Sequence, residues 1–187
     1  MAELIIGGAR SGKSAHAERL ARQAEAGGLS VIYLATAAAA PAADPEMQRR
    51  IAHHRARRPA HWRTLEVPLH LAEALMAHAS PTTCLLVDCL TLWLTNLFFA
   101  GQAAAQAEAG ETLACPLLQD EITALEAALP RLPGRVILVS NEVGWGIVPM
   151  ARLSRAFADE QGRLNQRLAA VCATVTLVAA GLPLRLK

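Results

Sequence analysis

The chain has 187 residues, of which 53% are hydrophobic and 18% are charged, and its formal net charge is +2. This composition excludes a disordered chain, and the length suits one α/β domain over residues 1–187 with a full hydrophobic core. The weak positive charge does not by itself indicate a nucleic-acid partner.

The first motif lies at residues 7–14, which we call the glycine loop, and it matches G-x-x-x-x-G-K-[ST] at every fixed position. An apolar run at residues 4–6 precedes it, and a stretch without Pro or Gly at residues 15–26 follows it. The expected strand, loop and helix would place backbone N–H groups and a helix N-terminus around phosphate oxygens. We therefore predict a nucleotide site, rather than a chance glycine turn, made by Gly7, Gly8, Ala9, Arg10, Ser11, Gly12, Lys13 and Ser14.

Strands and helices are expected to alternate along the rest of the chain. Apolar or alternating runs predict strands at residues 29–34, 62–67, 84–88, 135–140 and 175–179. Periodicity and capping residues predict helices at residues 44–58, 69–78, 90–99, 116–129 and 154–172. Residues 35–43 and 141–146 are expected to be loops, and the Ala-rich residues 102–111 an exposed, mobile segment.

This alternation of elements predicts a mainly parallel sheet covered by helices on both faces. In such sheets ligands bind at the carboxyl ends of the strands. Four polar residues follow strand ends and should converge on the glycine loop: Thr36, Asp88, Asn141 and Glu142. Asp88 has the position of a carboxylate that holds Mg²⁺ opposite the Ser14 hydroxyl, although it could also cap the following helix. We predict Mg²⁺ as the cofactor, held by Ser14 and Asp88.

Residues 49–63 combine several arginines with the adjacent His53 and His54, and they contain no acidic residue. A solvated basic face is the ordinary explanation of such a run. In a triphosphate-binding protein, however, neighbouring cations lower the pKa of an imidazole and keep it neutral and nucleophilic near pH 7. The guanidinium groups could then hold phosphates while the ring attacks phosphorus. A metal site is a poorer interpretation, because these cations would repel the ion.

Cysteine usage and hydropathy indicate a cytoplasmic protein. The four cysteines form no C-x-x-C pair, which favours reduced thiols. Residues 84–100 are apolar enough to suggest a membrane span, but Asp88 and several polar residues interrupt them, so no stable membrane insertion is expected. The chain enters the glycine loop at once, and we expect no signal peptide before it.

Three blocks of the sequence resemble the adenosylcobinamide kinase/adenosylcobinamide-phosphate guanylyltransferase family of cobalamin synthesis. They are GGARSGKS at residues 7–14, RIAHHRARRPAHWRTLE at 50–66 and SNEVGWGIVP at 140–149, and NQRL follows at 165–168. The resemblance implies a RecA-like P-loop fold and two activities. One phosphorylates the aminopropanol hydroxyl of adenosylcobinamide with ATP or GTP. The other transfers GMP from GTP to adenosylcobinamide phosphate through a guanylylated histidine and releases pyrophosphate. The family's histidine matches His54 better than His53.

The same resemblance implies further nucleotide-binding residues: Thr36, Ala37, Ala38, Arg55, Ala56, Arg57, Arg58, Glu66 and Asp88. It also implies a homo-oligomer, with a trimer as the expected arrangement and sites near subunit boundaries. Two other interpretations of the residues stay open. One is a plain small-molecule P-loop kinase whose arginines cover the phosphates. The other is a RecA-like ATPase that depends on nucleic acid, although the weak charge and the lack of interleaved aromatic residues favour no nucleic-acid partner.

Overall fold

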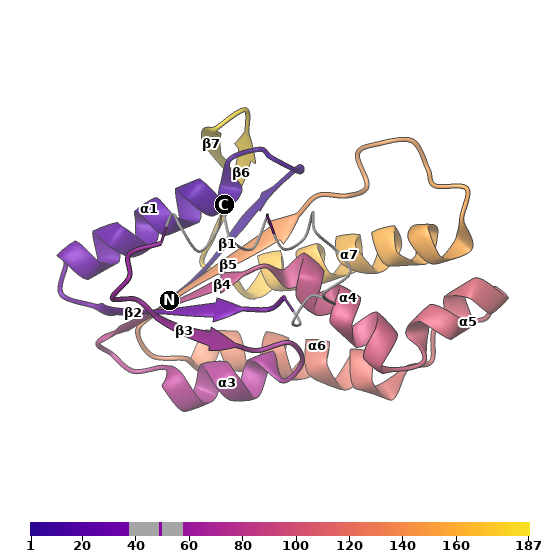
Figure 1. Cartoon of the computed structure of the whole chain (residues 1–187), viewed down its shortest axis with the longest axis horizontal. Helices are drawn as coiled ribbons and strands as arrows, with labels where there is room; N and C mark the ends of the chain where they lie inside the picture. Colours follow the sequence, from indigo (N-terminus) through magenta and orange to yellow (C-terminus); the bar gives the residue numbers. More distant parts are fainter. Residues whose placement is uncertain (38–48, 50–57) are drawn as a thin grey trace.

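The computed structural model describes residues 1–37, 49 and 58–187, and its centre is one seven-stranded sheet (Figure 1). The strands are β1 (Ala2–Gly7), β2 (Ser30–Ala35), β3 (Arg63–Glu66), β4 (Thr83–Asp88), β5 (Arg135–Asn141), β6 (Thr174–Ala179) and β7 (Leu182–Arg185). Their order in space is β3-β2-β4-β5-β1-β6-β7. All neighbouring strands run parallel except β6 and β7, which run antiparallel. The predicted mainly parallel sheet is confirmed.

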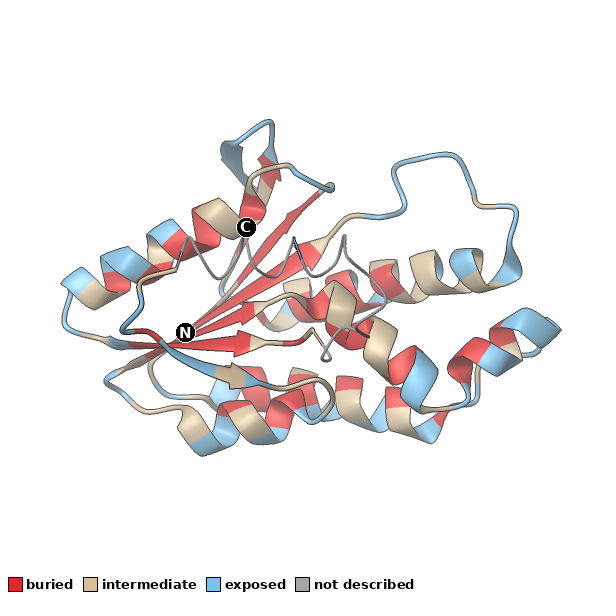
Figure 2. Cartoon of the chain, in the orientation of Figure 1, coloured by how far each residue is buried: buried red, intermediate tan, exposed pale blue. Residues whose placement is uncertain are grey.

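Helices cover both faces of this sheet, as expected (Figure 1). They are α1 (Lys13–Ala26), α3 (Leu71–His78), α4 (Leu90–Ala100), α5 (Ala103–Ala109), α6 (Pro116–Ala128), the 3-10 helix η1 (Leu129–Arg131) and α7 (Arg152–Val171). Helix α1 covers one face, over a small core that includes Ile5 and Ala21. Helices α3, α4, α6 and α7 cover the other face, over a larger core that includes Trp93 and Leu138. Figure 2 shows the buried residues gathered in the central strands and on the inner sides of the helices.

The central strands are mainly apolar because both of their faces are buried. The five residues between the ends of β5, for example, are all buried. Helix α4 occupies the apolar stretch that could be mistaken for a membrane span, and its inner residues Trp93, Leu94 and Phe98 are fully buried in the core. Among the described residues, no helix combines the length and the hydropathy needed to cross a membrane.

The expectation of a mobile loop at residues 102–111 is wrong, because helix α5 occupies Ala103–Ala109 and packs against α4 and α7. Ala103, Ala104 and Ala107 are buried. Alanine has the highest helix propensity, and its small side chain lets a short helix approach its neighbours closely. The low complexity of this segment therefore reflects close packing.

The hairpin of β6 and β7 was not predicted beyond its first strand. Ala180 and Gly181 connect the two strands with φ values of 50° and 81°. A two-residue turn with positive φ at both positions matches the twist of a hairpin, but it is usually signalled by Asn-Gly or Asp-Gly. The Gly181 N–H donates a hydrogen bond to the Ser11 carbonyl over 2.8 Å. Through this hydrogen bond, the hairpin stabilises the backbone of the glycine loop at Ser11.

Candidate nucleotide-binding site

The glycine loop connects β1 to α1 in the order that the sequence predicts. Gly7 must be glycine, because a Cβ there would lie 2.4 Å from the Val178 carbonyl oxygen and 2.6 Å from Ser11 Oγ. Gly12 adopts φ 97° at the N-cap of α1, a conformation that favours glycine. The N-terminus of α1 has neither a capping side chain nor an acidic residue in its first turn. Its partial positive charge is therefore available to an anion.

Lys13 lies across this loop and points toward the end of β4. Its side chain is 8% exposed, and its Nζ donates a hydrogen bond to the Gly8 carbonyl over 3.1 Å. Burial lowers the pKa of Lys13, while the nearby Cys89 and Asp88 act in the opposite direction. An anion at the loop would compensate for this burial. Ser11 Oγ is also buried, and it has no hydrogen-bond partner among the described residues.

The pairing register of the sheet places the carboxyl ends of β2, β3 and β4 side by side. Ala35 at the end of β2 lies opposite Glu66 on β3 and opposite Asp88 on β4. Asp88 in turn lies opposite Val139 on β5, the strand that separates β4 from β1. Asp88 and the glycine loop therefore share the carboxyl edge of the sheet, as predicted, whereas Glu66 lies on the outermost strand.

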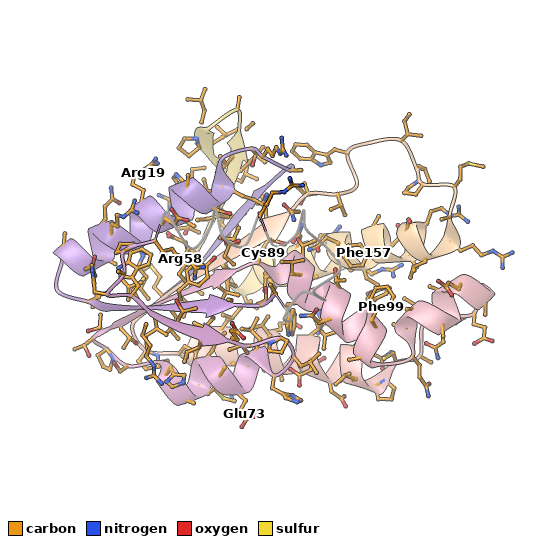
Figure 3. All side chains as sticks on the ribbon, in the orientation of Figure 1. Arg19, Arg58, Glu73, Cys89, Phe99 and Phe157 are labelled. Atoms are coloured by element: carbon orange, nitrogen blue, oxygen red, sulfur yellow. The ribbon has the colours of Figure 1, made fainter. Side chains whose placement is uncertain are left out.

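Tyr33 connects Asp88 to Arg58. The Tyr33 hydroxyl donates a hydrogen bond to Asp88 Oδ2 over 3.1 Å. Arg58, labelled in Figure 3, lies over the ring of Tyr33, with its Cζ 3.8 Å from the ring centroid. Burial, and then the charge of Asp88, raises the pKa of Tyr33, so its hydroxyl stays a proton donor. Tyr33 was not among the predicted site residues, because its only signal in the sequence was a polar group in an otherwise apolar strand.

Thr36 is fully buried and holds the turn after β4. Its Oγ1 donates to the Cys89 carbonyl over 2.6 Å and accepts from the Cys89 N–H over 2.9 Å. Asn96 of α4 donates to the Thr36 carbonyl over 2.7 Å. Thr36 therefore lies where expected, but its hydroxyl is used within the fold. Its contact with nucleotide stays a prediction.

A buried polar network fixes the end of β5. Asn165 of α7 donates from Nδ2 to the Asn141 carbonyl over 3.0 Å and to Glu142 Oε1 over 2.9 Å. Its Oδ1 accepts from Ser140 Oγ over 2.6 Å and from Gln161 Nε2 over 3.2 Å. The Glu142 N–H donates to the Gly7 carbonyl over 3.0 Å, so the end of β5 adjoins the glycine loop. Asn141 and Glu142 thus converge on this loop as predicted.

The side chains present at this edge fit Mg²⁺ bound together with a nucleotide. The Ser14 hydroxyl and the Asp88 carboxylate are hard oxygen donors of the kind that Mg²⁺ prefers. Within the described part of the chain, no group of three or more His, Cys, Asp or Glu could hold a metal ion alone. Mg²⁺ is commonly held by one or two protein oxygens together with phosphates and water. Ser14 and Asp88 would supply such a partial set.

The structure describes most of the predicted site residues, and their contacts with nucleotide stay predictions. It brings the glycine loop, Asp88 and the end of β5 to one edge of the sheet, with Thr36 bonded to Cys89 and Arg58 stacked on Tyr33. His54, together with Ala38, Arg55, Ala56 and Arg57, lies outside the described residues. The predicted helix at residues 44–58 falls largely in the same part of the chain.

Known proteins are similar to this chain along almost its whole length. A family model described as cobinamide kinase / cobinamide phosphate guanyltransferase matches residues 3–186. The bifunctional adenosylcobalamin biosynthesis protein CobP of Pseudomonas aeruginosa is 54% identical over 187 residues, covering 100% of this chain and 98% of that protein. Bifunctional adenosylcobalamin biosynthesis proteins CobU of Salmonella typhimurium and Escherichia coli are 45% and 43% identical over 185 residues, covering 98% of this chain and 98% of each relative.

A solved structure has a similar fold. An ATPase from the type III secretion system of pathogenic bacteria superposes with a TM-score of 0.54 at 12% identity, covering 94% of this chain and 50% of that protein. At this identity the likeness shows the fold alone. Together with the parallel sheet and the glycine loop, it confirms the predicted RecA-like P-loop α/β fold.

Proposed function

Because the chain belongs to the cobinamide kinase / cobinamide phosphate guanyltransferase family, we propose that both of its reactions use a nucleotide held at the glycine loop. The family and the full-length relatives identify a bifunctional enzyme of adenosylcobalamin biosynthesis, in agreement with the sequence prediction. Its kinase activity phosphorylates cobinamide, and its transferase activity adds a guanylyl group to cobinamide phosphate.

In the kinase step, ATP or GTP binds with its phosphates against the glycine loop. The N–H groups of the loop and the N-terminus of α1 receive the phosphate oxygens. Lys13, which now donates to the Gly8 carbonyl, turns to the terminal phosphates. Ser14 and Asp88 would hold Mg²⁺, which would neutralise charge on the phosphates. Tyr33 keeps the Asp88 carboxylate in position.

In the transferase step, we propose that a ring nitrogen of His54 attacks the α-phosphorus of GTP. The bond between this phosphorus and its bridging oxygen breaks, and pyrophosphate leaves. Cobinamide phosphate then attacks the guanylylated histidine and takes GMP from it. A covalent intermediate divides the transfer between two polyanions into two steps.

One observation carries this proposal, namely the position of Thr36 and Arg58, which precede and follow the part of the chain that contains His54. The chain leaves the sheet at Thr36, whose hydroxyl holds the residue after Asp88. It returns at Arg58, which stacks on Tyr33 next to Asp88. Thr36 and Arg58 are thus both joined to the strand ends beside the glycine loop, which supports a role for His54 there.

The covalent intermediate can be trapped with GTP labelled at the α-phosphate. We expect wild-type protein with Mg²⁺ and no corrinoid to retain label after denaturation, in an acid-labile and base-stable bond. His54→Ala should retain none, whereas the matched control His53→Ala should retain it. The reverse pattern would move the nucleophile to His53. A wild-type protein without label would contradict a covalent histidine intermediate.

A further inference from the structure

We propose that Glu142 is the catalytic base of the kinase step and accepts the proton of the corrinoid hydroxyl, an inference that rests on the proposed binding of nucleotide at the glycine loop. Glu142 follows β5, the strand between β1 and β4. Its N–H donates to the carbonyl of Gly7, the first residue of the loop, over 3.0 Å. Its backbone is thereby fixed beside the proposed phosphate site.

The carboxylate of Glu142 is oriented through one oxygen. Oε1 accepts a hydrogen bond from Asn165 Nδ2 over 2.9 Å. Asn165 is 6% exposed, and Ser140 and Gln161, both fully buried, donate to its Oδ1. Oε2 makes no hydrogen bond to a described residue, and it can accept a proton while Oε1 stays held. A buried network of three side chains thus positions the partly exposed carboxylate of Glu142.

Open space lies beside this carboxylate for an acceptor to approach. Glu142 lines an open hollow of about 330 Å³ between β1, β6 and α7. Ile6, Ala169 and Val175 give it aliphatic walls, and Gln166 and Lys187 add polar groups. Such mixed walls suit an alkyl arm that ends in a hydroxyl. The hydroxyl can therefore reach Glu142 from the side opposite α1.

The other carboxylates at the strand ends fit the role of base less well. Asp88 accepts from Tyr33 and lies near Lys13, so it is placed to hold Mg²⁺. Glu66 lies on β3, four strand positions from β1, which is about 19 Å at the usual strand spacing. A base must come within about 3 Å of the proton that it removes. Glu142 adjoins the loop directly.

The proposed step transfers the γ-phosphoryl group to the corrinoid hydroxyl. The hydroxyl oxygen forms a bond to the γ-phosphorus while the bond from this phosphorus to the β,γ-bridging oxygen breaks. The nucleoside diphosphate leaves with that electron pair. The hydroxyl proton passes to Glu142 Oε2, and water later removes it. No oxidant or further reactant is needed.

Glu142→Gln tests the proposal, because the amide keeps an oxygen for Asn165 but is not a base at neutral pH. We expect its kcat for cobinamide phosphorylation to fall about 10²- to 10⁴-fold, with the KM for cobinamide within about threefold of wild type. Guanylyl transfer to supplied cobinamide phosphate should stay near wild type, because that reaction deprotonates no hydroxyl. Glu142→Asp should restore part of the kinase rate.

Glu73→Gln is the matched control, since Glu73 is exposed on α3 and lies far from this edge in Figure 3. It should leave both activities unchanged. A folded Glu142→Gln protein with a wild-type kinase rate would overturn the proposal. Equal loss of both activities would also overturn it, because it would indicate a structural role. The kinase rates of wild type and Glu142→Gln can be compared whether or not His54 is labelled by GTP. The proposal for Glu142 and the proposal for His54 can therefore fail separately.

Discussion

Tyr33 on β2 and Asp88 on β4 are joined by a hydrogen bond of 3.1 Å from the phenol to Oδ2. The two residues are not opposite each other in the sheet, because Tyr33 lies opposite Leu86 and Asp88 lies opposite Ala35. The phenol therefore reaches along the sheet to the carboxylate. Since Arg58 stacks on the same ring, Tyr33 links the proposed metal ligand Asp88 to Arg58, which follows the predicted nucleophile His54 in the sequence.

Tyr33→Phe should weaken binding of Mg²⁺-GTP. The substitution keeps the ring beneath Arg58 and removes the hydrogen bond that orients Asp88. A hydrogen bond to a charged group contributes about 1.5–3 kcal/mol, so we expect the Kd to rise about 10- to 150-fold. Calorimetric titration with and without Mg²⁺ measures the effect, which should be present only with the metal. An equal loss in EDTA would show that the phenol acts on the nucleotide through another contact.

Lys13→Met should make the nucleotide-free protein more stable while it abolishes nucleotide binding. Burial lowers the pKa of Lys13 below its ordinary value of 10.5. Between the lowered value and 10.5, the unfolded chain binds more protons than the folded one, so stability rises with pH across this window. At neutral pH the buried ammonium therefore costs stability, and methionine removes that cost.

Thermal unfolding at pH 7 with and without Mg²⁺-GTP tests this prediction. Wild-type protein should gain Tm on adding the nucleotide, because a ligand that binds the folded state stabilises it. Lys13→Met should start from a higher Tm and gain nothing. A lower Tm for the nucleotide-free variant would mean that the hydrogen bond to Gly8 outweighs the cost of burial.

The fold and the position of the site could be predicted because their signals are local. The glycine loop can be recognised from the spacing of its fixed residues in the sequence. Asp88 and Glu142 follow apolar runs that form parallel strands, and this pairing brings both residues to one edge of the sheet. The contacts of Tyr33 and Asn165 could not be predicted. They depend on the register of β2 with β4 and on the face that α7 turns to Ser140. The single domain, the homo-oligomer and the role of His54 remain predictions.

Helix α5 was missed because its sequence has no amphipathic pattern, and its burial can be tested by a pair of substitutions. Ala107 is buried, whereas Ala105 on the same helix is exposed. Aspartate lowers helix propensity at both positions, and the helix dipole adds about 0.3–1 kcal/mol at either end, so only a larger difference between the variants reports burial. We expect Ala107→Asp to cost about 2–3 kcal/mol more than Ala105→Asp in urea unfolding, because it buries a charge without a partner. Equal losses would show that α5 does not contribute a packed face.

His16 should make the protein less stable as the pH falls below 6.5. It is 8% exposed, and its Nδ1 lies 2.6 Å from Arg19 Nη2, an arrangement in which the neutral ring accepts a hydrogen bond. Burial, and then the charge of Arg19, lowers the pKa of His16 from 6.5, against the opposing effect of Glu3. Below 6.5 the unfolded chain therefore binds a proton before the folded one does. The stability present above 6.5 is lost as the pH falls toward the lowered value.

His16→Asn keeps an acceptor near the position of Nδ1 but cannot take up the proton. We expect the Tm of wild-type protein to fall more steeply than that of His16→Asn between pH 7.5 and pH 5.0, a range chosen to span the ordinary titration of histidine at about 6.5. Arg19→Met should give an intermediate slope, because it removes the second cause of the shift and leaves burial in place. Parallel curves for wild type and His16→Asn would contradict this account, since the other titrating groups of the chain are common to both proteins.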